Sequence, residues 1–163
     1  MKKLILVLLM LAFSVCVADS AYEAIQMDDT FDTVTARYGE LIPAEEYLIA
    51  DDAILCFYES GRLQAKGRVY ESILDAASET VGSFAEVKKL KQGAPLEKLL
   101  AILGDGNEIM YINIADEENS GARRVLAWKN SDGNVLEALV ERDNGGWILF
   151  AITEIEVNTL QKL

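Results

Sequence analysis

Pairs of neighbouring acidic residues are the features of this chain that come closest to catalytic chemistry, because two carboxylates can divide general acid and base roles. They occur at residues 28–29, 45–46, 51–52 and 116–118. Adjacent residues of a strand point in opposite directions, and most of these places are predicted turns, so we interpret them as solvated surface. Histidine, the most common general base, is absent from the 163 residues. We therefore predict no catalytic residues and no enzyme.

Oxygen-bearing side chains at Asn130, Asp132 and Asn134 are compatible with a calcium site. The ligand series of a known calcium loop is missing, however, and a hairpin turn explains these residues equally well. Residues 104–106 resemble a phosphate loop only superficially, because they follow a predicted helix instead of opening one. We predict no metal and no cofactor.

Aromatic residues in or beside predicted strands are the candidate partner-binding residues: Tyr47, Tyr58, Tyr111, Trp128 and Trp147. Aromatic side chains anchor protein interfaces when they lie on an open sheet face. The alternative is that most of them pack inside the protein, which is the more common position of large aromatic residues in strands.

The N-terminus has the layout of a secretory signal peptide. Two lysines precede an uncharged apolar run over residues 4–17, and Asp19 is the first acidic residue. The run is shorter than the roughly 20 residues that a membrane span needs. We predict a signal peptide of residues 1–18 cleaved after Ala18, with Ser20 or Ala21 as alternative last residues. The mature protein is then expected to be periplasmic or secreted.

The two cysteines of the chain bear on membrane anchoring and on disulfide formation. Cys16 is a possible lipidation site that would anchor the chain to the cell envelope, although Val15 is bulky where such sites prefer a small residue. Cleavage after Ala18 leaves Cys56 alone, so no disulfide can form within the mature chain. Cys56 lies in an apolar run, and we interpret it as a buried, inert thiol, with an intermolecular disulfide as the alternative.

The chain is acidic, with 15 basic and 27 acidic residues and a formal net charge of −12. Removal of residues 1–18 takes away two lysines and leaves a charge of −14. Nucleic acid is therefore not an expected partner, because phosphate binding requires a basic surface. An acidic protein can be steered toward basic protein surfaces. We expect the partner to be another protein, and a membrane only if Cys16 is lipidated.

Residues 25–39 and 90–104 share one pattern at an offset of 65. In both, apolar residues recur at helical spacing, and a glycine, Gly39 or Gly104, ends the segment. Coincidence between two ordinary helices is the alternative reading. Shorter helices are predicted upstream from two capping-box spacings, Ser20 with Glu23 and Ser83 with Glu86.

Strand-like segments follow each helical region, separated by turn residues. They are residues 47–49, 54–58, 63–70, 109–114, 123–129, 135–142 and 147–155. Strict alternation places the small residues Ala65 and Gly67 on one face of their strand, where we expect a helix to lie close. In the last strand, alternation separates two apolar groups: Leu149, Ala151 and Ile155 on one face, and Ile148, Phe150 and Ile152 on the other.

These elements predict an α+β protein of two tandem repeats, each a short helix pair packed on a three- to four-stranded antiparallel sheet. The predicted first repeat unit covers residues 19–73, the connector 74–82 and the second repeat unit 83–163. The connector lacks flexible-linker composition, so we expect the units to pack together. Because both faces of the last strand are apolar, the face away from the helices should meet the other half, a partner, or both.

The duplicated order of elements, with Gly39 and Gly104 at corresponding helix ends, resembles the beta-lactamase inhibitor protein fold over residues 22–156. A single unit is also similar to the small protein A/OmlA domain of envelope lipoproteins. The resemblance implies an exported, non-catalytic protein whose sheet surface grips another protein. The chain departs from the inhibitor in lacking the disulfides on which that protein relies. It departs from the lipoproteins in having two units and no clear lipidation cysteine.

We therefore expect an exported protein-binding module that acts through an open antiparallel sheet surface. One alternative is a lipoprotein of outer-membrane assembly or maintenance, favoured if Cys16 is acylated. A second alternative is a small-ligand binder in the cleft between the repeats, which would be indicated by facing carboxylates of raised pKa.

Overall fold

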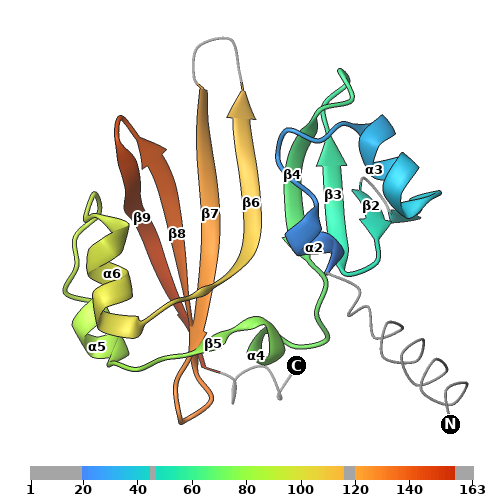
Figure 1. The fold of residues 1–163 in the computed structure, drawn as a ribbon. Helices are drawn as coiled ribbons and strands as arrows, with labels where there is room; N and C mark the ends of the chain where they lie inside the picture. Colours follow the sequence, from blue (N-terminus) through green and yellow to red (C-terminus); the bar gives the residue numbers. More distant parts are fainter. Residues whose placement is uncertain (1–19, 45–46, 116–119, 157–163) are drawn as a thin grey trace, which may run out of the picture.

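The protein has an α+β fold in which short helices pack on one large sheet (Figure 1). A computed structural model describes residues 20–44, 47–115 and 120–156. The predicted signal peptide, Cys16 and the acidic residues at 45–46 and 116–118 lie outside the described residues. Among the described residues, no helix combines the length and apolar character needed to span a membrane.

The described residues form five helices and nine strands. The helices are α2 (Ala21–Ala24), α3 (Phe31–Tyr38), α4 (Ile73–Ala76), α5 (Phe84–Val87) and α6 (Leu96–Leu103), labelled as in Figure 1. The strands are β1 (Ile42–Ala44), β2 (Tyr47–Ala50), β3 (Ala53–Phe57), β4 (Leu63–Arg68), β5 (Ser78–Glu79), β6 (Asn107–Ala115), β7 (Ser120–Lys129), β8 (Val135–Asp143) and β9 (Gly146–Ile155).

The strands join in the order β1-β2-β3-β4-β6-β7-β8-β9, and every neighbouring pair on this path is antiparallel. Strand β5 pairs with β7 in parallel. The pairing of β4 with β6, in which Lys66 lies opposite Tyr111, makes one continuous sheet from the two halves of the chain. The expected connector, residues 74–82, contains most of α4 and all of β5.

Local sequence signals explain where the helices begin and end. Ser20 and Thr30 are N-caps whose hydroxyl oxygens accept hydrogen bonds from backbone N–H groups of the first turn. Gly39 and Gly104 end α3 and α6, and both have a φ of 81°. This φ favours glycine, which has no Cβ to clash with the neighbouring backbone.

Helices α5 and α6 pack on β7, β8 and β9. The apolar stripe of α6 faces the sheet, because leucines recur at helical spacing on that side. The buried residues of this core are Phe84, Val87, Leu96, Leu99, Leu103, Leu126, Trp128, Leu136, Ala138, Val140 and Leu149.

Helices α2 and α3 pack on the same face of the sheet, over β2, β3 and β4 (Figure 1). The buried residues of this second core are Ala21, Tyr22, Ile25, Val34, Leu41, Ala50, Ala53, Leu55 and Leu63. We call the side covered by α2, α3, α5 and α6 the helix face, and the opposite side of the sheet the open face.

The expectation that Ala65 and Gly67 lie against a helix is wrong. Leu63 pairs with Phe57 while Ala65 pairs with Cys56, so Gln64 is an extra residue in β4. Such a β-bulge reverses the alternation. Leu63 therefore belongs to the helix-face core, whereas Ala65 and Gly67 line a groove on the open face.

Lys66 occupies the helix face in their place and is only 7% exposed. Its Nζ donates hydrogen bonds to the carbonyl oxygens of Tyr22 (2.7 Å) and Ile25 (2.9 Å), at the end of α2. A cation at this position satisfies carbonyl groups that the helix itself leaves unpaired. Burial lowers the pKa of Lys66.

A second bulge changes the predicted faces of β9. Leu149 pairs with Val140 and Ala151 pairs with Leu139, so Phe150 is the extra residue. As a result Leu149 and Ile152 both pack in the helix-face core, although strict alternation separates them.

The open face is covered at one end only. Helix α4 and the residues that follow it pack there in a small core, whose buried residues are Ala76, Ala77, Ile109, Ala127 and Val135. Lys129 Nζ donates a hydrogen bond to the carbonyl oxygen of Leu74 (3.0 Å) and holds α4 in place. The rest of the open face has no helix over it among the described residues.

Candidate functional site

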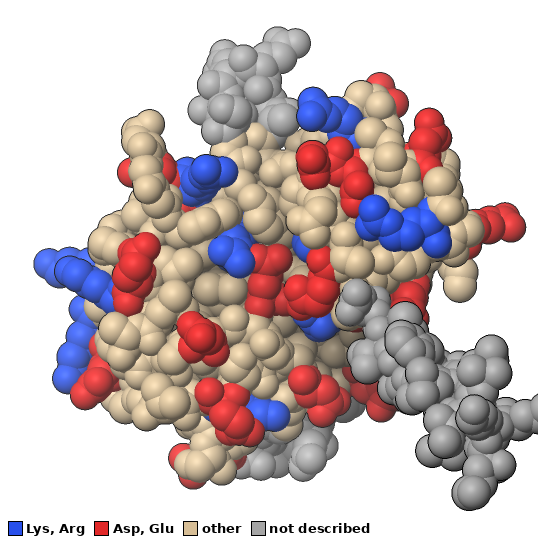
Figure 2. Space-filling view, viewed as in Figure 1, with Lys and Arg blue, Asp and Glu red and all other residues tan. Residues whose placement is uncertain are grey.

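The middle of the helix face is occupied by charged groups that bind one another. Tyr22 Oη donates a hydrogen bond to Glu108 Oε1 (2.9 Å), and Arg124 forms an ion pair with the same carboxylate. Figure 2 shows basic and acidic side chains close together on this face. Burial, followed by the charge of Glu108, raises the pKa of Tyr22. These groups join the two halves of the sheet, so little of their hydrogen-bonding capacity is left for a ligand.

Two of the predicted partner-binding residues, Tyr111 and Trp147, belong to this region. Their rings meet edge to face with centroids 5.9 Å apart, and the guanidinium of Arg124 lies 5.1 Å from the Trp147 ring centroid. Both side chains are half-buried. They pack beside the charged groups of the helix face rather than on the open face.

Trp128 is a core residue. Its side chain is completely buried, and its Nε1 donates a hydrogen bond to the carbonyl oxygen of Gly104 (3.0 Å). We therefore do not propose Trp128 as a contact residue for a partner.

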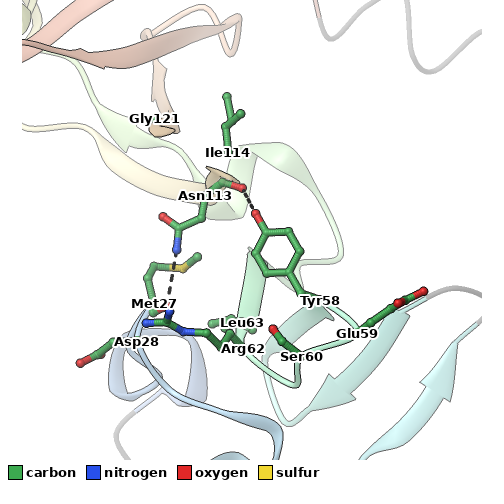
Figure 3. Close-up of a pocket in the computed structure, with 10 residues that line it drawn as sticks. All are labelled: Met27, Asp28, Tyr58, Glu59, Ser60, Arg62, Leu63, Asn113, Ile114 and Gly121. Carbon is green, nitrogen blue, oxygen red and sulfur yellow. Dashed lines mark hydrogen bonds between the residues drawn. The ribbon is translucent and has the colours of Figure 1, made fainter. Parts of the chain in front are cut away.

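Tyr58 lines a cavity of about 800 Å³ where the first half of the chain meets β6 and β7 (Figure 3). Its Oη donates a hydrogen bond to the carbonyl oxygen of Asn113 (2.8 Å). Asp28 and Glu59 lie at opposite ends of the cavity in Figure 3, so their carboxylates do not face each other. Among the described residues, the cavity thus lacks the pair of facing carboxylates that would indicate the small-ligand alternative.

The residues of the conceivable calcium site form a hairpin turn between β7 and β8. Asn130 Oδ1 accepts hydrogen bonds from the backbone N–H groups of Asp132 (3.0 Å) and Asn134 (2.9 Å). Across the part of the chain that the structure describes, no group of three or more His, Cys, Asp or Glu residues is placed to hold a metal ion.

The open face carries an apolar groove of about 670 Å³ across β2, β3, β4, β6, β7 and β8. We call it the open-face groove. It is lined by residues that include Tyr47, Ile54, Cys56, Ala65, Gly67, Val69, Tyr70, Met110, Ile112, Val125 and Glu137. A volume of this size lies within the range of ligand and side-chain pockets.

Large apolar side chains at the groove are open to solvent. Tyr47, Val69, Tyr70 and Met110 are each between 40% and 48% exposed. The small residues Ala65 and Gly67 leave the hollow between them, since a Cβ added to Gly67 would meet its nearest neighbour, the Ile109 carbonyl oxygen, only at 4.0 Å. A cluster of exposed apolar residues around a hollow is typical of an interaction site.

Glu137 is the acidic residue of the groove. It is half-buried, and burial raises the pKa of its carboxyl group. Both Glu137 and Tyr70 line the groove, and burial, followed by the charge of Glu137, raises the pKa of Tyr70. None of the ion pairs between described residues involves Glu137.

Beyond the groove, the open face carries an ion pair between two neighbouring strands. Arg123 and Glu141 form an ion pair at 3.6 Å across β7 and β8. The guanidinium of Arg123 also lies over the ring of Phe150, 4.8 Å from its centroid.

Comparison with known proteins does not assign the chain to a family. No protein-family model matches it, and no curated protein matches its sequence. We therefore infer the function from the geometry of the surface.

Of the predicted binding residues, Tyr47 alone lies at the open-face groove. Sequence reasoning missed Tyr70, Met110 and Glu137 as groove residues. Met110 offered a signal, because the flexible apolar side chain of methionine adapts to varied partners. Glu137 offered another, as a charge between the apolar residues Leu136 and Ala138.

Proposed function

We propose that this protein is a non-catalytic module that binds another protein through the open-face groove. The observation that supports this most is the exposed apolar cluster of Tyr47, Val69, Tyr70 and Met110 around a hollow on the side of the sheet away from α2, α3, α5 and α6. Leaving such a cluster in water is unfavourable, and a partner that covers it gains the free energy of apolar burial.

The composition of the groove suits a protein partner. Tyrosine supplies a large contact area with few rotatable bonds, and methionine adapts its shape to the surface it meets. The sheet beneath is held by continuous pairing from β2 to β8, so the groove is presented on a rigid support. Pre-organisation of this kind reduces the entropy lost on binding.

We also propose that the two halves are tandem repeat units, each with two helices on an antiparallel sheet. Helices α3 and α6 have eight residues each and end in glycines of the same φ. Isolated bridges precede both, from Thr30 to Arg62 and from Pro95 to Ile148. Thr30 and Pro95, like Gly39 and Gly104, are thus separated by 65 positions, which supports duplication.

Export to the periplasm or the medium is the compartment we propose, on the basis of the N-terminal apolar run. An envelope lipoprotein anchored at Cys16 is the alternative. The mass of the mature protein decides between them, because a chain that begins at Cys16 and carries lipid would contradict cleavage after Ala18. Binding of a small ligand in the cavity of Figure 3 is the weaker candidate.

A photo-crosslinking experiment tests the proposed function. Benzoylphenylalanine is placed at Met110 on the open face, or at Ala101, an exposed residue of α6 on the other side of the sheet. We expect the Met110 position to capture one protein in the native cell and the Ala101 position to capture none. The captured protein, once purified, should bind the wild-type chain. Equal capture from both positions, or capture from Ala101 alone, would contradict the proposal.

A further inference from the structure

We propose that the open-face groove receives a lysine or arginine side chain from an apolar segment of the partner, and that the carboxylate of Glu137 binds it. This inference rests on the proposed function and names the chemistry of the partner. It follows from the negative charge of Glu137 in the groove, which forms no ion pair with another described residue.

Glu137 has apolar and uncharged surroundings. Its neighbours across the sheet are Ala127 on β7 and Thr153 on β9. The groove around it is lined mainly by aliphatic and aromatic side chains, among them Val125 and Met110. A carboxylate in such a place loses hydration and gains no compensating partner from within the described chain.

The cationic residues of the neighbouring strand do not compensate it. Lys66 and Arg68 are among the groove residues, but their charged ends point to the helix face. Lys66 Nζ binds the carbonyl oxygens at the end of α2, and Arg68 forms ion pairs with Glu23 and with Asp52 (3.7 Å for the latter).

The cations that β7 places on the open face have partners as well. Lys129 forms an ion pair with Glu79 (3.5 Å) and donates a hydrogen bond to the carbonyl oxygen of Leu74 (3.0 Å). Arg123 lies on β7 and pairs with Glu141, which is on the same strand and the same face as Glu137. Glu137 and Glu141 therefore differ in one respect that matters here: Glu141 has a cationic partner within the chain and Glu137 has none among the described residues.

A basic side chain fits this arrangement. Its aliphatic stem can pack along Val125 and Met110 while its charged end reaches Glu137, and a charge-assisted hydrogen bond in apolar surroundings is stronger than one in water. Tyr70 also lines the groove, and an aromatic ring can bind the same cation. The negative net charge of the chain favours the approach of a basic segment.

Other occupants are less complementary. A metal ion would need several ligands, and the described residues place no such cluster around Glu137. A second copy of this chain would bring the same negative net charge of −12 to the groove.

The test uses a library of random linear peptides displayed on phage and selected on the purified full chain. Parallel selections use Glu137→Gln and the matched control Glu141→Gln. We expect peptides from the wild type and from Glu141→Gln to be enriched in lysine or arginine flanked by apolar residues, and peptides from Glu137→Gln to lack that enrichment. The best lysine peptide should bind Glu137→Gln about tenfold more weakly than the wild type.

The same loss should follow when the peptide lysine is replaced by norleucine, and the two losses should not add, because they remove one interaction. Peptides without a basic residue that still bind at the groove would overturn this inference and leave the proposed function standing. A tenfold loss in Glu141→Gln as well would also overturn it. Selection of no peptide at all, with no crosslink from Met110, would count against both.

Discussion

Replacement of Trp128 by alanine is expected to lower the free energy of unfolding by about 3–5 kcal/mol. The indole is completely buried between α6 and the sheet, and its removal leaves a cavity that the neighbouring leucines cannot fill. It also leaves the carbonyl oxygen of Gly104 without the Nε1 donor. Packing is tight here, since a Cβ added to Gly106 would lie 2.3 Å from Trp128 Cζ2.

Urea unfolding followed by circular dichroism measures this loss, and Trp147→Ala is the matched control. Trp147 is half-buried, so its replacement removes less buried apolar area. We therefore expect Trp147→Ala to lower the free energy of unfolding clearly less than Trp128→Ala. Equal losses for the two variants, or a loss below about 1 kcal/mol for Trp128→Ala, would contradict the assignment of Trp128 to the core.

Ala65→Trp is expected to weaken binding of the protein captured at Met110 by about 30-fold or more, a loss of about 2 kcal/mol that is typical of a disrupted interface centre. The new indole fills the hollow at the floor of the open-face groove, while the helix-face core stays untouched. Isothermal titration of the captured protein into the purified variant gives the affinity.

The control for this substitution is Ala101→Trp, which adds the same side chain to the exposed surface of α6. It should leave the affinity within about twofold of the wild type, since surface changes away from an interface have small effects. Both variants should keep the unfolding midpoint of the wild type within a few degrees. Unchanged affinity in Ala65→Trp would place the interface away from the groove.

Secondary structure could largely be predicted from the sequence, because caps, glycines and periodic apolar residues act locally. Ser20 and Thr30 begin helices as N-caps, and Gly39 and Gly104 end them. Which face each strand residue occupies could not be predicted, because a bulge depends on the partner strand. One extra residue at Gln64 in β4 exchanged the faces expected for Ala65 and Gly67.

The site was predictable only in part. Tyr47 was a candidate because of its aromatic character and lies at the open-face groove, but Trp128 has the same character and is fully buried. Local pattern cannot separate the two, since burial depends on how α6 packs on the sheet. Glu137 becomes conspicuous only when the hydrogen bonds of Lys66 and the ion pairs of Arg68, Arg123 and Lys129 are known, because these contacts leave it without a cation among the described residues.

The central claim is that a partner protein covers the open-face groove. Cys56 reports on this directly, because it is half-buried and lines the groove instead of being fully buried as the sequence predicted. The measurement is the rate of alkylation of Cys56 by N-ethylmaleimide, read at the Cys56 peptide by mass spectrometry, with and without the captured protein. Acetylation of Lys98, an exposed residue of α6, is the control on the helix side. We predict that saturating partner slows the Cys56 reaction at least about tenfold and leaves Lys98 unchanged. An unchanged Cys56 rate in the bound protein, or protection of Lys98 instead, would contradict binding through the open-face groove.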